Sequence, residues 1–105
     1  MSEQDNHPQA PPPPPTFSFL ILSLKWQAEM QLGLLPFGEE KPEPDLAHAR
    51  HSIDMLAMLQ EKTKGNLTPE EQRLIENSLT ELRFRFVNVS EDMARTPAAP
   101  PAPAE

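Results

Sequence analysis

The stretch K-T-K-G-N-L-T-P-E-E at residues 62–71 decides the fold, because it stops one helix and starts another. Lys62 and Lys64 would lie in the last turn of the helix that ends here, where cations complement the helix dipole. Gly65 then supplies a left-handed residue after that helix. Thr68 can cap the next helix, and Glu71 can complete a capping box with it. Only residues 65–67 separate the two helices, so the sequence predicts an antiparallel helical hairpin.

The segments on either side of this stretch repeat with helical spacing. Upstream, Asp45 is a favourable N-cap for a helix over 45–64, and downstream the pattern predicts a helix over 68–88. Each helix has one stripe of residues, at steps of three and four, that we expect to be buried. The stripes are Leu46, Ala49, Ile53, Leu56 and Gln60 in the helix over 45–64, and Ile75, Ser78, Leu79, Leu82, Phe86 and Val89 in the helix over 68–88.

Residues 17–35 form the remaining predicted element, and their pattern is ambiguous. From Leu22 to Leu34 apolar and polar residues alternate strictly, which is typical of a half-buried strand. The residue types, mostly Leu, Lys, Gln, Ala, Glu and Met, favour a helix, and thirteen residues would make an unusually long strand. We therefore interpret the segment as a helix that Gly33 and Pro36 end, with a strand as the alternative.

As a helix, this segment has two apolar faces. The first would pack on the hairpin and contains Phe17, Leu20, Ile21, Leu24, Ala28, Leu32 and Leu35. The second contains Phe19, Trp26 and Met30. Because a three-helix unit needs one apolar face from each helix, the second face predicts self-association, as a dimer or a higher even oligomer.

The sequence thus predicts an all-α fold, with a small three-helix domain at residues 16–90 in which the first helix packs across the hairpin. Residues 36–44, rich in proline and glutamate, predict a loop. Most of the 14 prolines fall at the two ends of the 105-residue chain. Proline fixes φ and lacks an amide donor, so residues 1–15 and 91–105 are predicted to be disordered Pro-rich tails.

Composition excludes several classes of protein. The absence of cysteine excludes a disulfide scaffold and thiolate metal sites. Nine Lys and Arg residues against 16 Asp and Glu residues give a net charge of −7, which argues against nucleic-acid binding because an acidic chain repels phosphate. No segment approaches the roughly 20 apolar residues that span a bilayer. No export signal is readable either, so we expect a cytoplasmic protein.

Residues 53–71, I-D-M-L-A-M-L-Q-E-K-T-K-G-N-L-T-P-E-E, together with L-T-E-L-R-F-R at 79–85, resemble the bacterial family catalogued as domain of unknown function 1844. The strings Q-L-G-L-L-P at 31–36 and D-L-A-H-A-R-H-S-I-D at 45–54 fit the same pattern. The resemblance therefore covers nearly all of residues 16–87 and neither tail. It implies a small, mostly helical bacterial protein, and it carries no established activity, substrate or cofactor.

One candidate metal site lies on the second predicted helix. His48 and His51 are one turn apart, and Met55 and Met58 follow on the same side, so imidazole and thioether ligands could face one ion. Metal sites in proteins normally need three or four ligands, and nothing in the sequence supplies the others. The alternative is a solvated flank of the helix without a metal.

A candidate nucleic-acid site consists of Arg83, Arg85 and Lys64. The arginines alternate with phenylalanines, as in platforms that bind single-stranded nucleic acid. Phe86 belongs to the predicted core stripe, which leaves only Phe84 as a stacking surface. The acidic balance of the chain argues against this site as well.

No group of residues predicts catalysis. The glutamates of the third predicted helix have no apolar surroundings that would raise a pKa, and they are interpreted as capping and solvated residues. We therefore expect no enzyme activity and no cofactor. The sequence predicts a homo-oligomeric interaction or scaffold protein with an unidentified protein partner. The alternatives are an RNA- or ribosome-associated factor and, more weakly, a metal-binding regulator.

Overall fold

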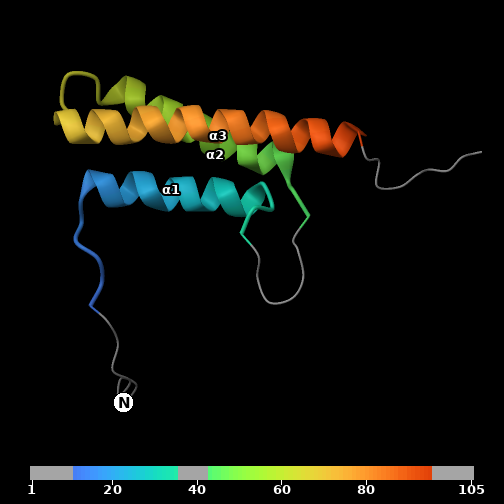
Figure 1. Ribbon diagram of the computed structural model, residues 1–105. Helices are drawn as coiled ribbons and strands as arrows, with labels where there is room; N and C mark the ends of the chain where they lie inside the picture. Colours follow the sequence, from blue (N-terminus) through green and yellow to red (C-terminus); the bar gives the residue numbers. More distant parts are fainter. Residues whose placement is uncertain (1–10, 36–42, 96–105) are drawn as a thin grey trace, which may run out of the picture.

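The structure is a computed structural model that describes residues 11–35 and 43–95. It contains three helices, α1 (Phe17–Gln31), α2 (Leu46–Lys62) and α3 (Pro69–Arg95), and no strand within the described ranges (Figure 1). The all-α prediction is confirmed, and the strand alternative for residues 22–34 is wrong. Most of the predicted loop and most of both predicted tails lie outside the described residues.

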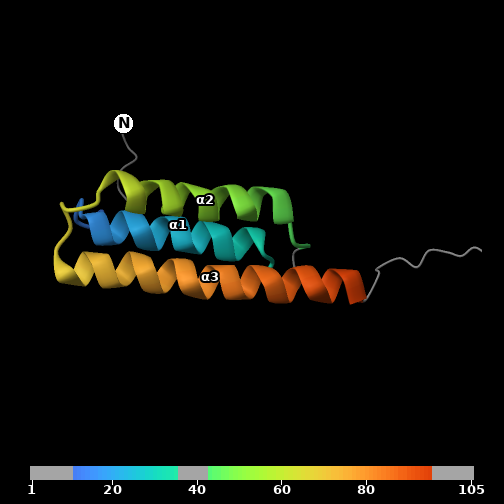
Figure 2. The same ribbon diagram turned by 90° about the horizontal axis from the view of Figure 1, so that it is seen from above.

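The three helices lie lengthwise beside one another (Figures 1 and 2). Both views show α1 and α3 running in one direction and α2 in the opposite direction. Each helix contacts the other two. The expectation that α1 crosses the other two helices is wrong, because α1 lies along both of them and so contacts each over several turns.

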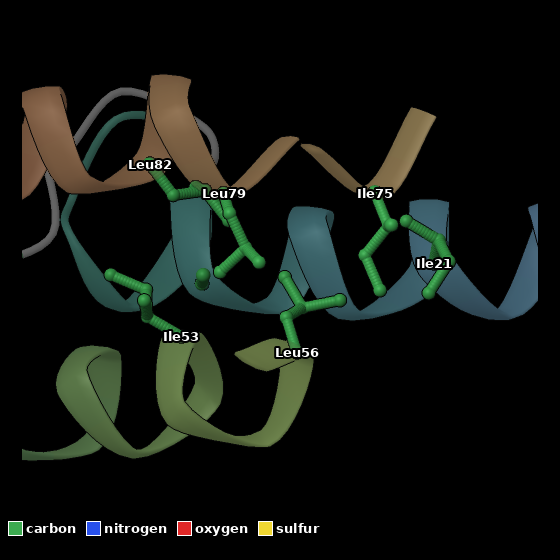
Figure 3. Packing of buried hydrophobic residues seen from close by; sticks show 7 residues of the cluster. Ile21, Ile53, Leu56, Ile75, Leu79 and Leu82 are labelled. Carbon is green, nitrogen blue, oxygen red and sulfur yellow. The ribbon is translucent and has the colours of Figure 1, made fainter. Parts of the chain in front are cut away.

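The core lies where the three helices meet, and its side chains point toward one another from all three (Figure 3). Its buried hydrophobic members are Ile21, Ala28, Ile53, Leu56, Ile75, Leu79 and Leu82. The predicted stripes of α2 and α3 supply most of this cluster. The prediction for α1 was wrong at Leu20, which is 43% exposed. This residue lies about 100° around the helix from the fully buried Ile21, outside the arc that two neighbouring helices cover.

The predicted helix starts are confirmed by their hydrogen bonds. The Asp45 carboxylate accepts a bond from the His48 backbone N–H at 3.1 Å. The Thr68 hydroxyl accepts from the Glu71 backbone N–H at 3.1 Å, and the Glu71 carboxylate accepts from the Thr68 backbone N–H at 2.9 Å. This reciprocal pair is a capping box. A further cap, which was not predicted, is Thr16, whose hydroxyl caps α1 by accepting from the Phe19 backbone N–H at 3.0 Å.

The end of α1 comes at Gln31, earlier than the predicted residue 35. Gly33 has a φ of 76°, and its N–H donates to the Met30 carbonyl at 3.0 Å. The next N–H, of Leu34, donates to the Glu29 carbonyl, also at 3.0 Å. These two bonds and the left-handed glycine form a Schellman motif, which satisfies the last carbonyls of the helix and turns the chain away.

The other two helices also end at different residues than predicted. α2 ends at Lys62, so Lys64 lies in the following turn and not in the helix. α3 continues to Arg95, so residues 91–95, which the sequence analysis assigned to the tail, are helical. No glycine or proline occurs between Phe86 and Arg95, and nothing in the sequence therefore interrupts the helix there.

Gly65 has a φ of 84°, as expected for a left-handed residue after α2. We expect Gly65→Val to lower the free energy of unfolding by about 1 kcal/mol or more, because a β-branched residue is strained at positive φ. No atom lies within 4 Å of the position a Cβ would take, so the loss would come from the backbone alone. Urea denaturation checks this. Gly65→Asn is the control and should lose less, since asparagine tolerates this conformation; equal losses would contradict the explanation.

Candidate functional site

The outer face of α1 carries a line of large apolar side chains, which we call the α1 stripe. Its members are Phe19, Leu22, Trp26 and Met30, which are 37%, 38%, 59% and 40% exposed. They recur at steps of three and four residues and lie opposite the fully buried Ile21 and Ala28. The exposure predicted for three of them is confirmed. Leu22 was not predicted to belong to this face, although its place between Phe19 and Trp26 at helical spacing indicated it.

Neither charged residue of α1 is free to solvate this stripe. The Lys25 ammonium lies 3.0 Å from a carboxylate oxygen of Glu81 on α3, and Arg85 lies 2.8 Å from the other oxygen. The hydrogen bond from Lys25 lowers the pKa of the Glu81 carboxyl. The other charged residue, Glu29, is only 8% exposed. Lys25 is thus ion-paired with 22% of its side chain exposed, and Glu29 is almost buried, so little charge on α1 faces a partner that covers the stripe.

The hydroxyl of Ser23, beside the stripe, is also satisfied within the helix. Ser23 lies between Phe19 and Trp26, and its hydroxyl donates to the Phe19 carbonyl at 2.9 Å. A covered hydroxyl is costly only when it has no hydrogen-bond partner. The stripe can therefore be buried without leaving this group unpaired.

A polar contact attaches α1 to α2. The Gln27 side-chain amide donates to the Ser52 hydroxyl at 3.2 Å, and that hydroxyl donates to the Gln31 side-chain oxygen at 2.6 Å. Ser52 is 1% exposed, so this bond pair lies inside the interface between the helices. It is a second polar link of α1 to the bundle, in addition to the Lys25–Glu81 ion pair on α3.

The candidate metal residues lie on the solvent side of α2. His48 and His51 are exposed, and His48 Nδ1 lies 2.8 Å from an Asp45 carboxylate oxygen. The backbone N–H of His48, with a smaller effect from its side chain, holds the pKa of the Asp45 carboxyl below its usual value. Within residues 11–35 and 43–95, no three His, Cys, Asp or Glu side chains come close enough to hold a metal ion. The structure therefore adds no third ligand of these types to the histidine pair.

The candidate nucleic-acid residues are not brought together. Arg83 and Arg85 project about 200° apart around α3, so they flank opposite sides of the exposed Phe84. Arg83 borders a hollow of about 340 Å³ between α2 and α3, whereas Arg85 is paired with Glu81 on the side of α1. Lys64 borders a different hollow, which two glutamates and two glutamines also line. Phe86 packs against the core, as predicted.

The sequence that forms this site and its surroundings matches the model of a known family. A family model described as a domain of unknown function, DUF1844, matches residues 14–88. The chain belongs to the DUF1844 family. The match confirms the resemblance and includes all of α1, with its stripe, and α2. No curated protein and no solved structure matches the chain.

No activity accompanies the DUF1844 description, so the chemistry of the chain's own surface must indicate its function. None of the three helices combines the length and the apolar character that a membrane crossing requires. Across the described ranges of this DUF1844 chain, the α1 stripe is a line of four large apolar side chains that are each at least 37% exposed. Its members follow one another at helical spacing, whereas the exposed Val87 on α3 lines a hollow with Arg50 and Arg83, and the exposed Phe84 lines another with Arg85.

Proposed function

We propose that this DUF1844 protein is a cytoplasmic, non-catalytic interaction protein that works as a homo-oligomer joined through the α1 stripe. The observation that supports this function is the line of four large apolar side chains, with Trp26 59% exposed, on a helix whose two charged residues are an ion-paired lysine and a nearly buried glutamate. Surface helices normally place charged residues on the side opposite the core. An uncharged, aromatic outer face is instead typical of a surface that is covered in use.

A second copy of the same chain is the simplest cover. In a two-fold contact the same face is buried on both copies, so a single interface removes all eight stripe side chains from water. The stripe is short, and self-association through it alone would be reversible. An oligomer of this kind leaves α2 and the outer side of α3 available to present to another protein.

The test uses the single tryptophan of the chain, which lies in the stripe. Light scattering at micromolar concentration should give the mass of a dimer or a higher even oligomer. Dilution should shift the fluorescence maximum of Trp26 to longer wavelength as the indole returns to water. A monomeric mass over the whole concentration range, with an unchanging emission maximum, would contradict the proposed function.

A further inference from the structure

We propose that the hollow between α2 and α3 binds an acidic peptide segment of a partner protein, with a large apolar side chain of the peptide on its floor. The hollow has a volume of about 340 Å³. Three residues of each helix line it: Arg50, Ile53, Asp54, Arg83, Phe86 and Val87. The inference goes beyond the proposed self-association, because these residues belong to α2 and α3 and lie outside the α1 stripe.

The floor of the hollow is apolar and is held in place by the core. Ile53 is a buried member of the core cluster, and Phe86 packs against that cluster. Val87, which is 50% exposed, extends the floor toward solvent. The volume of the hollow falls within the range of about 300–1,000 Å³ that is usual for ligand pockets. A large apolar side chain can therefore leave water here on a surface that is already formed.

The charges of the hollow favour an anion. Arg50 lies 3.9 Å from the Asp54 carboxylate, and both side chains are largely exposed, so this ion pair is weak. Within residues 11–35 and 43–95, no ion pair involves Arg83. Two guanidinium groups against one carboxylate leave an excess positive charge at the hollow, in a chain whose net charge is −7. Guanidinium groups bind carboxylates through paired hydrogen bonds, which makes a carboxylate the matching group.

The two arginines lie toward opposite ends of the hollow. On each helix the arginine comes first and the other two lining residues follow at three and four positions. Because α2 and α3 run in opposite directions (Figure 2), Arg50 and Arg83 are separated by the apolar floor. A chain that crosses the floor therefore meets a guanidinium on either side of its apolar contact. This arrangement fits a peptide in which acidic residues flank a large apolar residue.

A peptide fits the hollow better than a nucleic acid or a small molecule does. The Asp54 carboxylate would repel a phosphate, whereas it can accept a hydrogen bond from a peptide N–H, a donor that the phosphodiester backbone lacks. Small-molecule pockets bury about 70–90% of their ligand. Here the side chains of Arg50 and Asp54 are 71% and 66% exposed, so the hollow is open to water. A peptide can continue from the hollow onto the neighbouring surfaces of α2 and α3.

The experiment begins with a random-peptide library displayed on phage and selected on the full-length protein. We expect the enriched peptides to be net negative and to contain a large apolar residue within two positions of a carboxylate. Synthetic copies labelled with fluorescein then give dissociation constants by fluorescence anisotropy. Arg83→Glu should weaken their binding by at least about tenfold, because it replaces an attraction by a repulsion. Val87→Ser should weaken it by about threefold, because it removes apolar area from the floor.

Two variants on α3 control for charge and for charge geometry. Arg73→Glu makes the same charge reversal at an exposed position outside the hollow, and should change the affinity by less than about twofold. Arg83→Lys keeps the charge without the planar fork, and should lose less than Arg83→Glu. Arg73 and Arg83 are both exposed, so all three arginine variants should keep the circular-dichroism spectrum and the melting temperature of the wild type.

Three results would overturn the inference. A selection that enriches no peptide over the Arg83→Glu protein, or that enriches neutral or basic peptides, would refute the acidic class. Equal affinity of the enriched peptides for the wild type and Arg83→Glu would place their site elsewhere. Binding of a labelled uridine oligonucleotide that is lost in Arg83→Glu would assign the hollow to nucleic acid instead.

Light scattering of the same samples keeps this inference separate from the proposed self-association. Arg83→Glu should have the same mass as the wild type, because Arg83 lies outside the α1 stripe. A monomeric wild type that still binds acidic peptides through Arg83 would refute self-association and leave the peptide site standing. An oligomer that Arg83→Glu dissociates would instead show that a second copy covers the hollow, and would overturn the peptide site.

Discussion

Replacing Trp26 by glutamate and Met30 by lysine is expected to convert the oligomer into monomers that keep most of their helical circular-dichroism signal. Both side chains are largely exposed in a single chain, at 59% and 40%, so the charged replacements remain in water in the monomer. In the oligomer the same charges would be buried without partners, and an unpaired charge in an interface costs several kcal/mol. We expect self-association to weaken by at least about a hundredfold.

Light scattering at micromolar concentration measures this change, and a matched pair of substitutions on α2 controls for the added charge. Ala47→Glu with His51→Lys introduces the same two charges at the same spacing on an exposed face, and should leave the oligomer intact. If the Trp26→Glu, Met30→Lys protein remained oligomeric, the interface would have to lie on another face. If both double variants dissociated, general charge effects would explain the result.

Leu82→Ala is expected to lower the free energy of unfolding by about 3 kcal/mol. The Leu82 side chain is fully buried in the core cluster, so its removal loses transfer free energy and leaves a cavity that the surrounding helices fill only in part. Small domains have total stabilities on the order of 5–15 kcal/mol. This one side chain should therefore account for a large part of the stability of the bundle.

The control for this prediction is the same chemical change at Leu20. Because Leu20 is 43% exposed, Leu20→Ala removes a side chain that already contacts water and should cost less than about 1 kcal/mol. Urea denaturation of both variants at one protein concentration gives the comparison. Equal losses at the two positions would mean that Leu20 is buried, as the sequence pattern alone suggested, and that α1 is rotated relative to the described arrangement.

The features that were predicted correctly depend on residues close together in the chain. The capping box joins Thr68 to Glu71, and the positive φ of Gly65 belongs to a turn with a clear stop and start on either side. The exposed face of α1 was likewise visible, because Phe19, Trp26 and Met30 follow helical spacing once the segment is taken as a helix. Such local patterns contain the physical cause of the structure within a few residues.

The features that were missed depend on contacts between distant parts of the chain or on the absence of a residue that would end a helix. The width of the buried arc on α1, which excludes Leu20, is determined by where α2 and α3 lie. The neutralisation of Lys25 by Glu81 joins residues on different helices, so no local pattern indicated that the stripe lacks a free charge. The end of α3 was placed too early because the apolar periodicity weakens after Val89, whereas helical backbone persists until something interrupts it.

The hydroxyl of Ser52, held between Gln27 and Gln31, determines the rotational setting of α1. Because α1 has two apolar faces, a turn about its own axis that buried Trp26 and Met30 and exposed Ile21 and Ala28 would still place an apolar face on the core. Such a turn would break the hydrogen bonds to Ser52 of α2 and the ion pair between Lys25 and α3. Hydrophobic contact has no preferred direction, so it would not by itself prevent the turn. Three polar side chains of α1, those of Lys25, Gln27 and Gln31, therefore determine which of its apolar faces is buried and which remains exposed.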